Sequence, residues 1–193
     1  MNEDIKQFFD DKSSSWDQME SSSKEERREF LSFLDIKEGD KVLDLGCGTG
    51  VITPLLLERA KTDITALDLS PKMIEIAKEK FKDEPLMHFQ SGDYLDFEGK
   101  GFDWIIVFNA YPHFLDVEAF KKKTLSLLKE GGKLAIVHNL GRVDLAKHHS
   151  GAVHVYSRDL DDPTTEANVY KPEMKILLAD ESSSSFRIVL EKI

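Results

Sequence analysis

Between about residues 41 and 139 the sequence alternates short apolar runs with amphipathic segments, and few folds accommodate such an alternation. Strands are predicted over 41–46, 63–70, 85–90, 102–109 and 133–139, and helices over 51–60, 71–82 and 116–129. The strand-like runs are almost continuously apolar, which is typical of a sheet covered on both faces. We therefore expect an α/β fold with a parallel, doubly wound sheet.

The ends of these segments carry local signals. Ser70 can cap the helix that starts at Pro71, and the sequence "EGG" is expected to break the helix over 116–129. Beyond residue 139 the pattern weakens, and it predicts a helix over 141–150, a loop over 158–172 and two strands around the serines at 182–185.

Length and composition favour one ordinary water-soluble domain. The 193 residues suffice for a sizeable core, and the longest clean apolar run, 104–108, is far too short to cross a bilayer. The acidic N-terminus lacks the layout of a secretory signal, so we expect a cytoplasmic location. The single cysteine, Cys47, excludes an intrachain disulfide and a multi-cysteine metal site.

The net charge of −10 argues against a nucleic-acid partner, because proteins that bind nucleic acids usually present a basic surface. Lys121, Lys122 and Lys123 are interpreted as a solvated helix face. The acidic balance favours small or cationic ligands. We expect neither nucleic acid nor membrane as a partner.

The stretch "VLDLGCGTG" is the strongest motif, with glycines at 46, 48 and 50 between a predicted strand and a predicted helix. Glycines in this context let the backbone approach a ligand closely. The dinucleotide fingerprint would need a glycine at Val51, and a phosphate-binding P-loop would need a following Gly-Lys-Ser/Thr. Both of these ligand classes are disfavoured.

Three carboxylates accompany the motif, each with a structural alternative. Asp44 suits a ligand with an ammonium and a sulfonium group, although it could cap local backbone amides. Asp68 ends the second strand and can accept both hydroxyls of an adenosine ribose, or it could support the helix entry at Ser70. Asp93 can accept from the adenine amine beside Tyr94, or it forms a simple Gly-Asp turn.

The elements "LDLGCGTG", "ALDLS" and "GDYLDF", in this order, resemble the class I S-adenosylmethionine-dependent methyltransferases, in particular the small-molecule branch of the ubiquinone and menaquinone type. The resemblance covers about 41–139. It implies a Rossmann-like sheet of seven strands, mostly parallel with an antiparallel last strand, and S-adenosylmethionine as cofactor. The implied cofactor-binding residues are Asp44, Gly46, Cys47, Gly48, Thr49, Gly50, Asp68, Leu69, Met73, Asp93, Tyr94 and Asn109.

By the same resemblance, the N-terminal "FFDDKSSSWDQ" is similar to a helix that closes over the site. Phe8, Phe9 and Trp16 would be lid residues, although they could equally pack the helix against the domain. We therefore expect a single domain with a helical lid over 1–35, a cofactor-binding core over 36–140, and an acceptor-side segment with terminal strands over 141–193.

The fourth predicted strand ends in the polar and aromatic sequence "NAYPHF". The carboxyl end of a central strand faces the ligand crevice in open α/β folds, so Asn109, Tyr111 and His113 are expected around the methyl group to be transferred. The sequence only loosely resembles the "Asn-Pro-Pro-Tyr" signature of amino-methyltransferases that act on adenine or glutamine. This mismatch weakens a nucleic-acid-base substrate.

Histidines gather near the same predicted sheet edge. His113 follows the fourth strand and His138 ends the fifth, while His148, His149 and His154 come soon after. A histidine here could act as general base, several could hold a metal, or all could be structural. We expect His113, Tyr111 and His138 as catalytic candidates and assign no metal site.

The sequence therefore predicts a methyltransferase for a small-molecule acceptor. Alternatives are a methyltransferase that acts on protein or nucleic acid and a non-catalytic S-adenosylmethionine-binding protein. From about residue 150 to residue 172 the chain departs from the family pattern, which usually carries a helix there. The acceptor pocket is therefore expected to be more open or to be completed by a second subunit in a homodimer.

Overall fold

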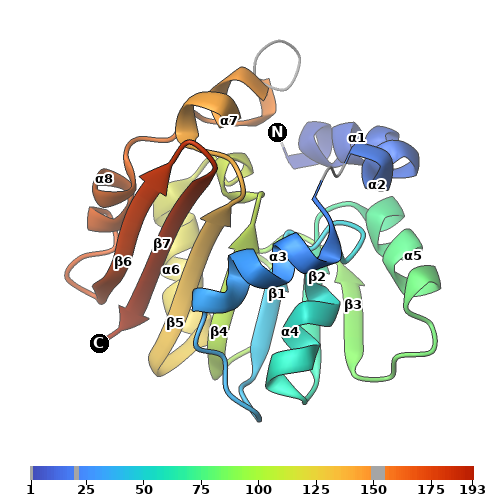
Figure 1. Cartoon of the computed structure of the whole chain (residues 1–193), viewed down its shortest axis with the longest axis horizontal. Coiled ribbons are helices and arrows are strands. Elements are labelled where there is room, and N and C mark those ends of the chain that lie inside the picture. The colour runs from blue at the N-terminus through green and yellow to red at the C-terminus, as the bar shows by residue number, and fades with distance from the viewer. Residues whose placement is uncertain (1, 20–21, 149–154) are drawn as a thin grey trace. The chain divides into compact units, whose positions relative to one another are not determined.

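The computed structural model describes residues 2–19, 22–148 and 155–193 (Figure 1). It has the predicted α/β fold, with a seven-stranded sheet that is parallel except for strand β7. The contacts divide the chain into two compact units, 1–97 and 98–193. The predicted division into lid, core and acceptor-side segment stays a prediction.

The first unit contains three parallel strands in the order β3-β2-β1. Its helices are α1 (Asn2–Lys12), α2 (Trp16–Met19), α3 (Lys24–Phe30), α4 (Thr53–Ala60) and α5 (Pro71–Lys80), with short 3-10 turns at Ser13–Ser15 and Leu31–Phe33. Its strands are β1 (Val42–Leu45), β2 (Ile64–Asp68) and β3 (Met87–Ser91).

Helix α5 begins where its sequence predicts. The hydroxyl oxygen of Ser70 accepts a hydrogen bond from the amide of Met73 at 3.1 Å, and Pro71 occupies the first helical turn, where a missing amide costs nothing. Met73, Ile74 and Ala77 are buried along one face, which packs the helix onto the sheet.

The second unit contains four strands in the order β4-β5-β7-β6. They are β4 (Phe102–Phe108), β5 (Leu128–His138), β6 (Met174–Ser182) and β7 (Ser185–Lys192). The helices are a 3-10 turn at Tyr111–His113, α6 (Val117–Leu127), α7 (Arg142–His148) and α8 (Pro163–Asn168). Because β7 runs antiparallel to both of its neighbours, the prediction of an antiparallel last strand is confirmed.

Two of the predicted elements were wrong. "EGG" does not end a helix; α6 has already ended at Leu127, and these residues lie inside β5, which begins at Leu128. Residues 163–168, expected as loop, form α8. Its start is set by the carboxylate of Asp162, which accepts from the amides of Thr164 and Thr165.

The interpretation of the three lysines as solvated was also wrong for Lys121. Its side chain is only 12% exposed; the ammonium group donates to the carbonyl of Val169 at 3.0 Å and pairs with Glu173 at 2.9 Å. It therefore ties α6 to the turn after α8. In the described part of the chain, the helices lack the length and the apolar character that a membrane span requires.

Candidate functional site

The loop after β1 is built from backbone that only glycine tolerates. Gly48 and Gly50 have φ angles of +54° and +81°, a region that residues with side chains rarely adopt. A Cβ atom on Gly50 would lie 2.8 Å from the ring of Phe81, and one on Gly48 would lie 3.4 Å from the indole nitrogen of Trp16. The loop therefore offers main chain, not side chains, to a ligand.

Asp68 fastens this loop to the end of β2. One carboxylate oxygen accepts from the amide of Gly48 at 2.8 Å, and the other accepts from the amide of Ser70 at 2.8 Å. Burial raises the pKa of Asp68, while the hydrogen bonds from the amides of Ser70 and Gly48 lower it, and the net change is upward. The carboxylate thus supports the helix entry, as the structural alternative expected, and also lies against the glycine loop.

Asp44 lies in β1, directly before the loop, and is 1% exposed. Its carboxylate accepts a hydrogen bond from the hydroxyl of Thr53, at the start of α4, at 2.6 Å. Burial raises the pKa of Asp44 to about 7, and the nearby charge of Asp68 adds to the increase. A negative charge at this position therefore gains from any cation that approaches it.

The side chains of two predicted cofactor residues point into the core. Cys47 packs in a buried cluster with Ala66 and Phe89, and burial raises the pKa of its thiol well above the usual value. Met73 is likewise buried in α5. For Cys47, this leaves the main chain as the part available to a ligand. Leu69, by contrast, is half-buried.

The residues after β3 form a turn. The carboxylate of Asp93 accepts from the amide of Leu95 at 2.9 Å, and Tyr94 beside it is buried. The observed turn matches the structural alternative for Asp93, and the side chain keeps partial exposure. A role toward adenine stays a prediction.

Helix α2 contacts the glycine loop through Trp16 and Asp17, and α1 packs against α5. The carboxylate of Asp17 accepts from the hydroxyl of Thr49 at 2.5 Å and from the ammonium of Lys80 at 2.9 Å. Asp10 accepts from the hydroxyl of Ser70 at 2.5 Å. Sequence reasoning did not identify Asp10 or Asp17, and nothing in their local pattern distinguishes them from solvated helix residues.

The three predicted lid aromatics form a row. The rings of Phe8 and Phe9 meet edge to face at 5.3 Å, and those of Phe9 and Trp16 at 5.6 Å. Trp16 places its indole nitrogen beside Gly48. This row therefore reaches the loop that the sequence motif forms.

In the second unit, Asn109 closes β4 with a φ of +54°. Its side-chain amide donates to the side-chain oxygen of Asn139 at 2.8 Å, and its own side-chain oxygen accepts from the main-chain N–H of Asn139 at 3.1 Å. This reciprocal pair joins the carboxyl ends of β4 and β5. A contact with the cofactor stays a prediction for Asn109.

Tyr111 is completely buried, and its hydroxyl bonds to that of Tyr170 at 2.9 Å. The guanidinium of Arg158 lies 4.7 Å from the centre of its ring. Burial raises the pKa of Tyr111 to about 12. The side chain is therefore neutral at physiological pH, and it holds the turn in place.

The predicted histidines are in different surroundings. His113 is half-buried, and its Nδ1 lies 2.9 Å from the carbonyl oxygen of Tyr156. His138 is completely buried, with its ring edge-on to Phe186 at 5.8 Å. His149 and His154 lie outside the described residues, and for His148 only its place at the end of α7 is described.

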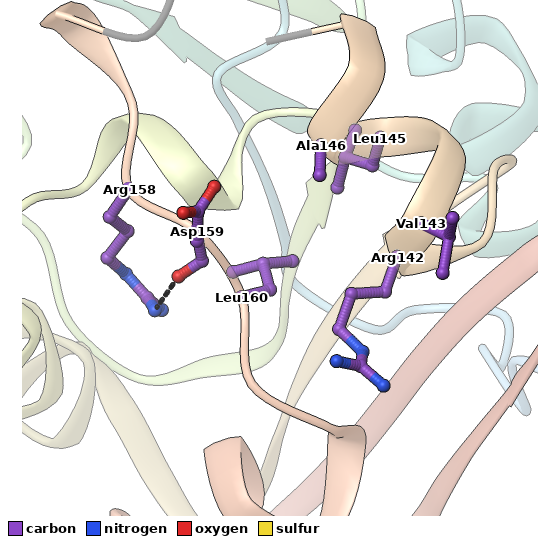
Figure 2. Close-up of a pocket in the computed structure, with 7 residues that line it drawn as sticks. All are labelled: Arg142, Val143, Leu145, Ala146, Arg158, Asp159 and Leu160. Atoms are coloured by element: carbon purple, nitrogen blue, oxygen red, sulfur yellow. Dashed lines mark hydrogen bonds between the residues drawn. The ribbon is translucent and has the colours of Figure 1, made fainter. Parts of the chain in front are cut away.

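Among the described residues, no group of three or more histidine, cysteine or acidic side chains is placed to hold a metal ion. A cavity of about 330 Å³ is lined by residues of α7 and of the segment 158–160. Figure 2 shows its lining residues, which are Arg142, Val143, Leu145, Ala146, Arg158, Asp159 and Leu160. None of these was predicted as a site residue.

Residues 42–132 match the family model of a methyltransferase domain. Among curated proteins, the demethylmenaquinone methyltransferase of Tropheryma whipplei (strain Twist) is 31% identical over 112 residues, which cover 57% of this chain and 46% of the relative. The chain thus spans about half the length of this relative. The part that the family model matches, 42–132, includes the glycine loop.

Solved structures show the same fold. A chain of the Haloferax volcanii complex between the Trm112 methyltransferase activator and a methyltransferase aligns with a TM-score of 0.80 at 17% identity, and 95% of this chain and 97% of that chain are covered. The N-methyltransferase NodS from Bradyrhizobium japonicum, in complex with S-adenosylhomocysteine, aligns with a TM-score of 0.75 at 16% identity. The alignment covers 97% of this chain and 98% of that chain. Residues 42–132 thus carry a methyltransferase domain similar to that of the class I S-adenosylmethionine-dependent methyltransferases, and the solved structures share the fold of the chain.

Proposed function

We propose that this chain transfers a methyl group from S-adenosylmethionine to a small-molecule acceptor. The observation that carries the proposal is the Asp68 carboxylate, which ends β2 and accepts from Gly48 of the glycine loop. Nucleoside ligands of open α/β folds use these two elements together, since the loop admits the ligand to the backbone and the carboxylate accepts ribose hydroxyls.

The residues of the first unit fit this cofactor. In the proposal, Asp44 and the loop over 46–50 hold the methionine part, Asp68 holds the ribose, and Asp93 holds the adenine amine. The glycine loop is a cradle that side chains would fill, and the carboxylates suit a ligand with ammonium and sulfonium groups. When bound, the cofactor supplies a methyl group on a sulfonium, which is a good leaving group.

A small-molecule acceptor is supported by the net charge of −10 and by the name of a relative, a demethylmenaquinone methyltransferase. Methyl transfer requires mainly that donor and acceptor lie in line, so positioning supplies much of the rate. A base is needed where the acceptor must lose a proton, as a phenol, thiol or enol carbon would.

Of the three catalytic candidates, His113 fits the role of base best. A carbonyl oxygen only accepts hydrogen bonds, so the Nδ1 atom that faces the carbonyl of Tyr156 carries the ring proton. In the neutral ring the lone pair then lies on Nε2, which can take a proton from the acceptor. Tyr111 has a pKa of about 12 and serves as a positioning residue, while His138 is completely buried.

We further infer that the N-terminal segment is a lid. Trp16, Asp17 and Asp10 contact the glycine loop or the start of α5, which are the elements assigned to the cofactor. A lid over these elements would exclude water from the methyl group. A homodimer that completes the acceptor pocket stays a prediction.

The test is a calorimetric titration of S-adenosylmethionine, and separately of NAD, into the wild type, Asp68→Asn and the control Asp96→Asn. Asp96 is an exposed carboxylate in the turn after β3. We expect only S-adenosylmethionine to bind, with an affinity about 100-fold lower in Asp68→Asn, since two charge-assisted bonds are weakened. The control should bind as the wild type does.

Transfer is then followed with methyl-labelled S-adenosylmethionine against panels of reduced quinones, phenols, thiols, amines, RNA and protein. Labelling of one of the small molecules would support the proposal. Labelling of RNA or protein only would replace the acceptor class, and binding without any transfer would favour a non-catalytic binding protein. A folded wild type that does not bind S-adenosylmethionine would overturn the proposal.

A further inference from the structure

Glu166 is a buried acid that the proposed chemistry does not use. It lies in α8 and is 3% exposed. Both of its carboxylate oxygens accept from the guanidinium of Arg158, at 2.7 and 2.8 Å, and one also accepts from the amide of Asp161 at 2.9 Å. Such a bidentate pair fixes the guanidinium in both position and orientation.

The other side of Arg158 faces the turn after β4. Its guanidinium lies over the ring of Tyr111, and its amide donates to the carbonyl of Pro112 at 2.9 Å. Two residues earlier, the carbonyl oxygen of Tyr156 meets Nδ1 of His113. The segment 156–161 is thus bound to Tyr111, Pro112 and His113 on one side and to Glu166 on the other.

We propose that Arg158 and Glu166 are positioning residues that set the orientation and the tautomer of the His113 ring. This inference rests on the proposed function insofar as His113 is the base of methyl transfer. The pair holds the segment that brings the Tyr156 carbonyl to Nδ1, and that carbonyl keeps the proton on Nδ1 and the lone pair on Nε2.

A buried ion pair is weak evidence for stability, because well-packed apolar residues often stabilise a fold as much or more. What apolar residues would not provide is the fixed direction of a planar guanidinium that meets a carboxylate with two bonds. The Arg158–Glu166 pair therefore fixes the position of the segment that contacts the His113 turn.

The test is nitrogen NMR of the protein labelled in its histidine rings, about two pH units above the usual histidine pKa, where the rings are neutral. The His113 signals are assigned by their loss in His113→Gln. We expect Nδ1 to be protonated in the wild type. In Glu166→Gln, which keeps the volume but loses the charge, we expect a mixture of Nδ1–H and Nε2–H forms.

Glu173→Gln is the matched control, because Glu173 also pairs with a cation of the same unit, but that cation, Lys121, is bonded to the turn after α8 and not to the His113 turn. It should keep the wild-type signature. Arg158→Lys, which retains the charge but cannot form the bidentate pair, should behave as Glu166→Gln does and replaces it if that variant does not fold.

Persistence of the pure Nδ1–H form in the folded Glu166→Gln or Arg158→Lys protein would overturn the proposal. So would an equal change in Glu173→Gln, since the effect would then be one of general stability. The measurement needs neither S-adenosylmethionine nor an acceptor. Its result is therefore independent of whether methyl transfer itself is found.

Discussion

The glycine loop over 46–50 and the turn over 109–113 both follow a buried strand, but they are held in different ways. The loop is shaped by its backbone angles and by hydrogen bonds that its amides donate to the carboxylate of Asp68 and to the carbonyl of Leu67. The turn is held mainly by side chains that arrive from distant positions, among them Asn139 and Tyr170.

This difference bears on how each region tolerates change. A loop that depends on glycine conformations is destabilised when a side chain is added, because its positive φ angles are unfavourable for other residues. A turn held by a network of side chains fails when one partner is removed, because the other is left buried without its bond.

The largest effect is expected beneath the glycine loop, at Asp44. Folding raises its pKa from 3.8 to about 7, so the folded protein keeps a proton that the unfolded chain loses. Stability should therefore fall as the pH rises from about 4 to 7, by a total on the order of 4 kcal/mol from this group. Asp44→Asn should remove this part of the pH dependence and be the more stable protein at pH 8.

Urea unfolding at pH 5 and pH 8 measures the part of this loss that falls above pH 5, about 3 kcal/mol, with the exposed Asp96→Asn as control. If the wild type and Asp44→Asn lose the same stability between these two pH values, burial does not tune the carboxylate, and the loop would rest on backbone alone.

The next effect concerns the loop backbone. Gly50→Ala places a methyl group 2.8 Å from Phe81 and 3.1 Å from Phe89, at a φ of +81°. We expect a loss of about 3 kcal/mol of unfolding free energy, from strain and overpacking together. Gly39→Ala is the matched control, since its φ is +89° and nothing lies within 4 Å; it should lose about 1 kcal/mol. Equal losses would show that packing under the loop is unimportant.

A smaller effect is expected at the N-terminal cover. Trp16→Ala removes the indole next to Gly48 and should weaken S-adenosylmethionine binding about tenfold, or about 1.4 kcal/mol, by loss of contact and of water exclusion. Phe8→Ala, at the far end of the aromatic row, is the control and should weaken binding less. Tighter binding in Trp16→Ala would mean that the segment competes with the ligand instead of covering it.

The smallest effect concerns the pair of tyrosine hydroxyls in the second unit. Tyr111→Phe and Tyr170→Phe should each cost about 1 kcal/mol, because each removes the hydrogen bond between two buried hydroxyls. The double variant should cost clearly less than the sum of the two, since both polar groups are then gone. A double-mutant cycle of thermal or urea unfolding measures the coupling. Additive losses would remove this bond from the network that holds the turn.

Sequence reasoning succeeded where the signal is local. Ser70 and Pro71 predicted the start of α5, and the glycine motif predicted a strand, loop and helix in the correct places. The start of α8 was missed because Asp162 and Pro163 suggest a loop as readily as a helix start, and only the observed cap decides.

The contacts around the candidate site were less predictable, for a physical reason. Asp10 meets Ser70 across 60 residues, and Asp17 meets Thr49 across 32, so no periodicity relates them. Arg158 and Glu166 lie only eight residues apart, but an irregular segment and a helix start separate them, and neither residue type predicts burial. Long-range contacts of polar side chains depend on the finished fold.

The burial of Cys47 gives the chain a built-in reporter. It is the only thiol, it lies inside the glycine loop, and both its 4% exposure and its raised pKa protect it from alkylating reagents. Its rate of modification by a thiol reagent therefore measures how often the loop opens. Saturation with S-adenosylmethionine should slow that rate, which turns local dynamics at the cofactor loop into a quantity that a spectrophotometer records.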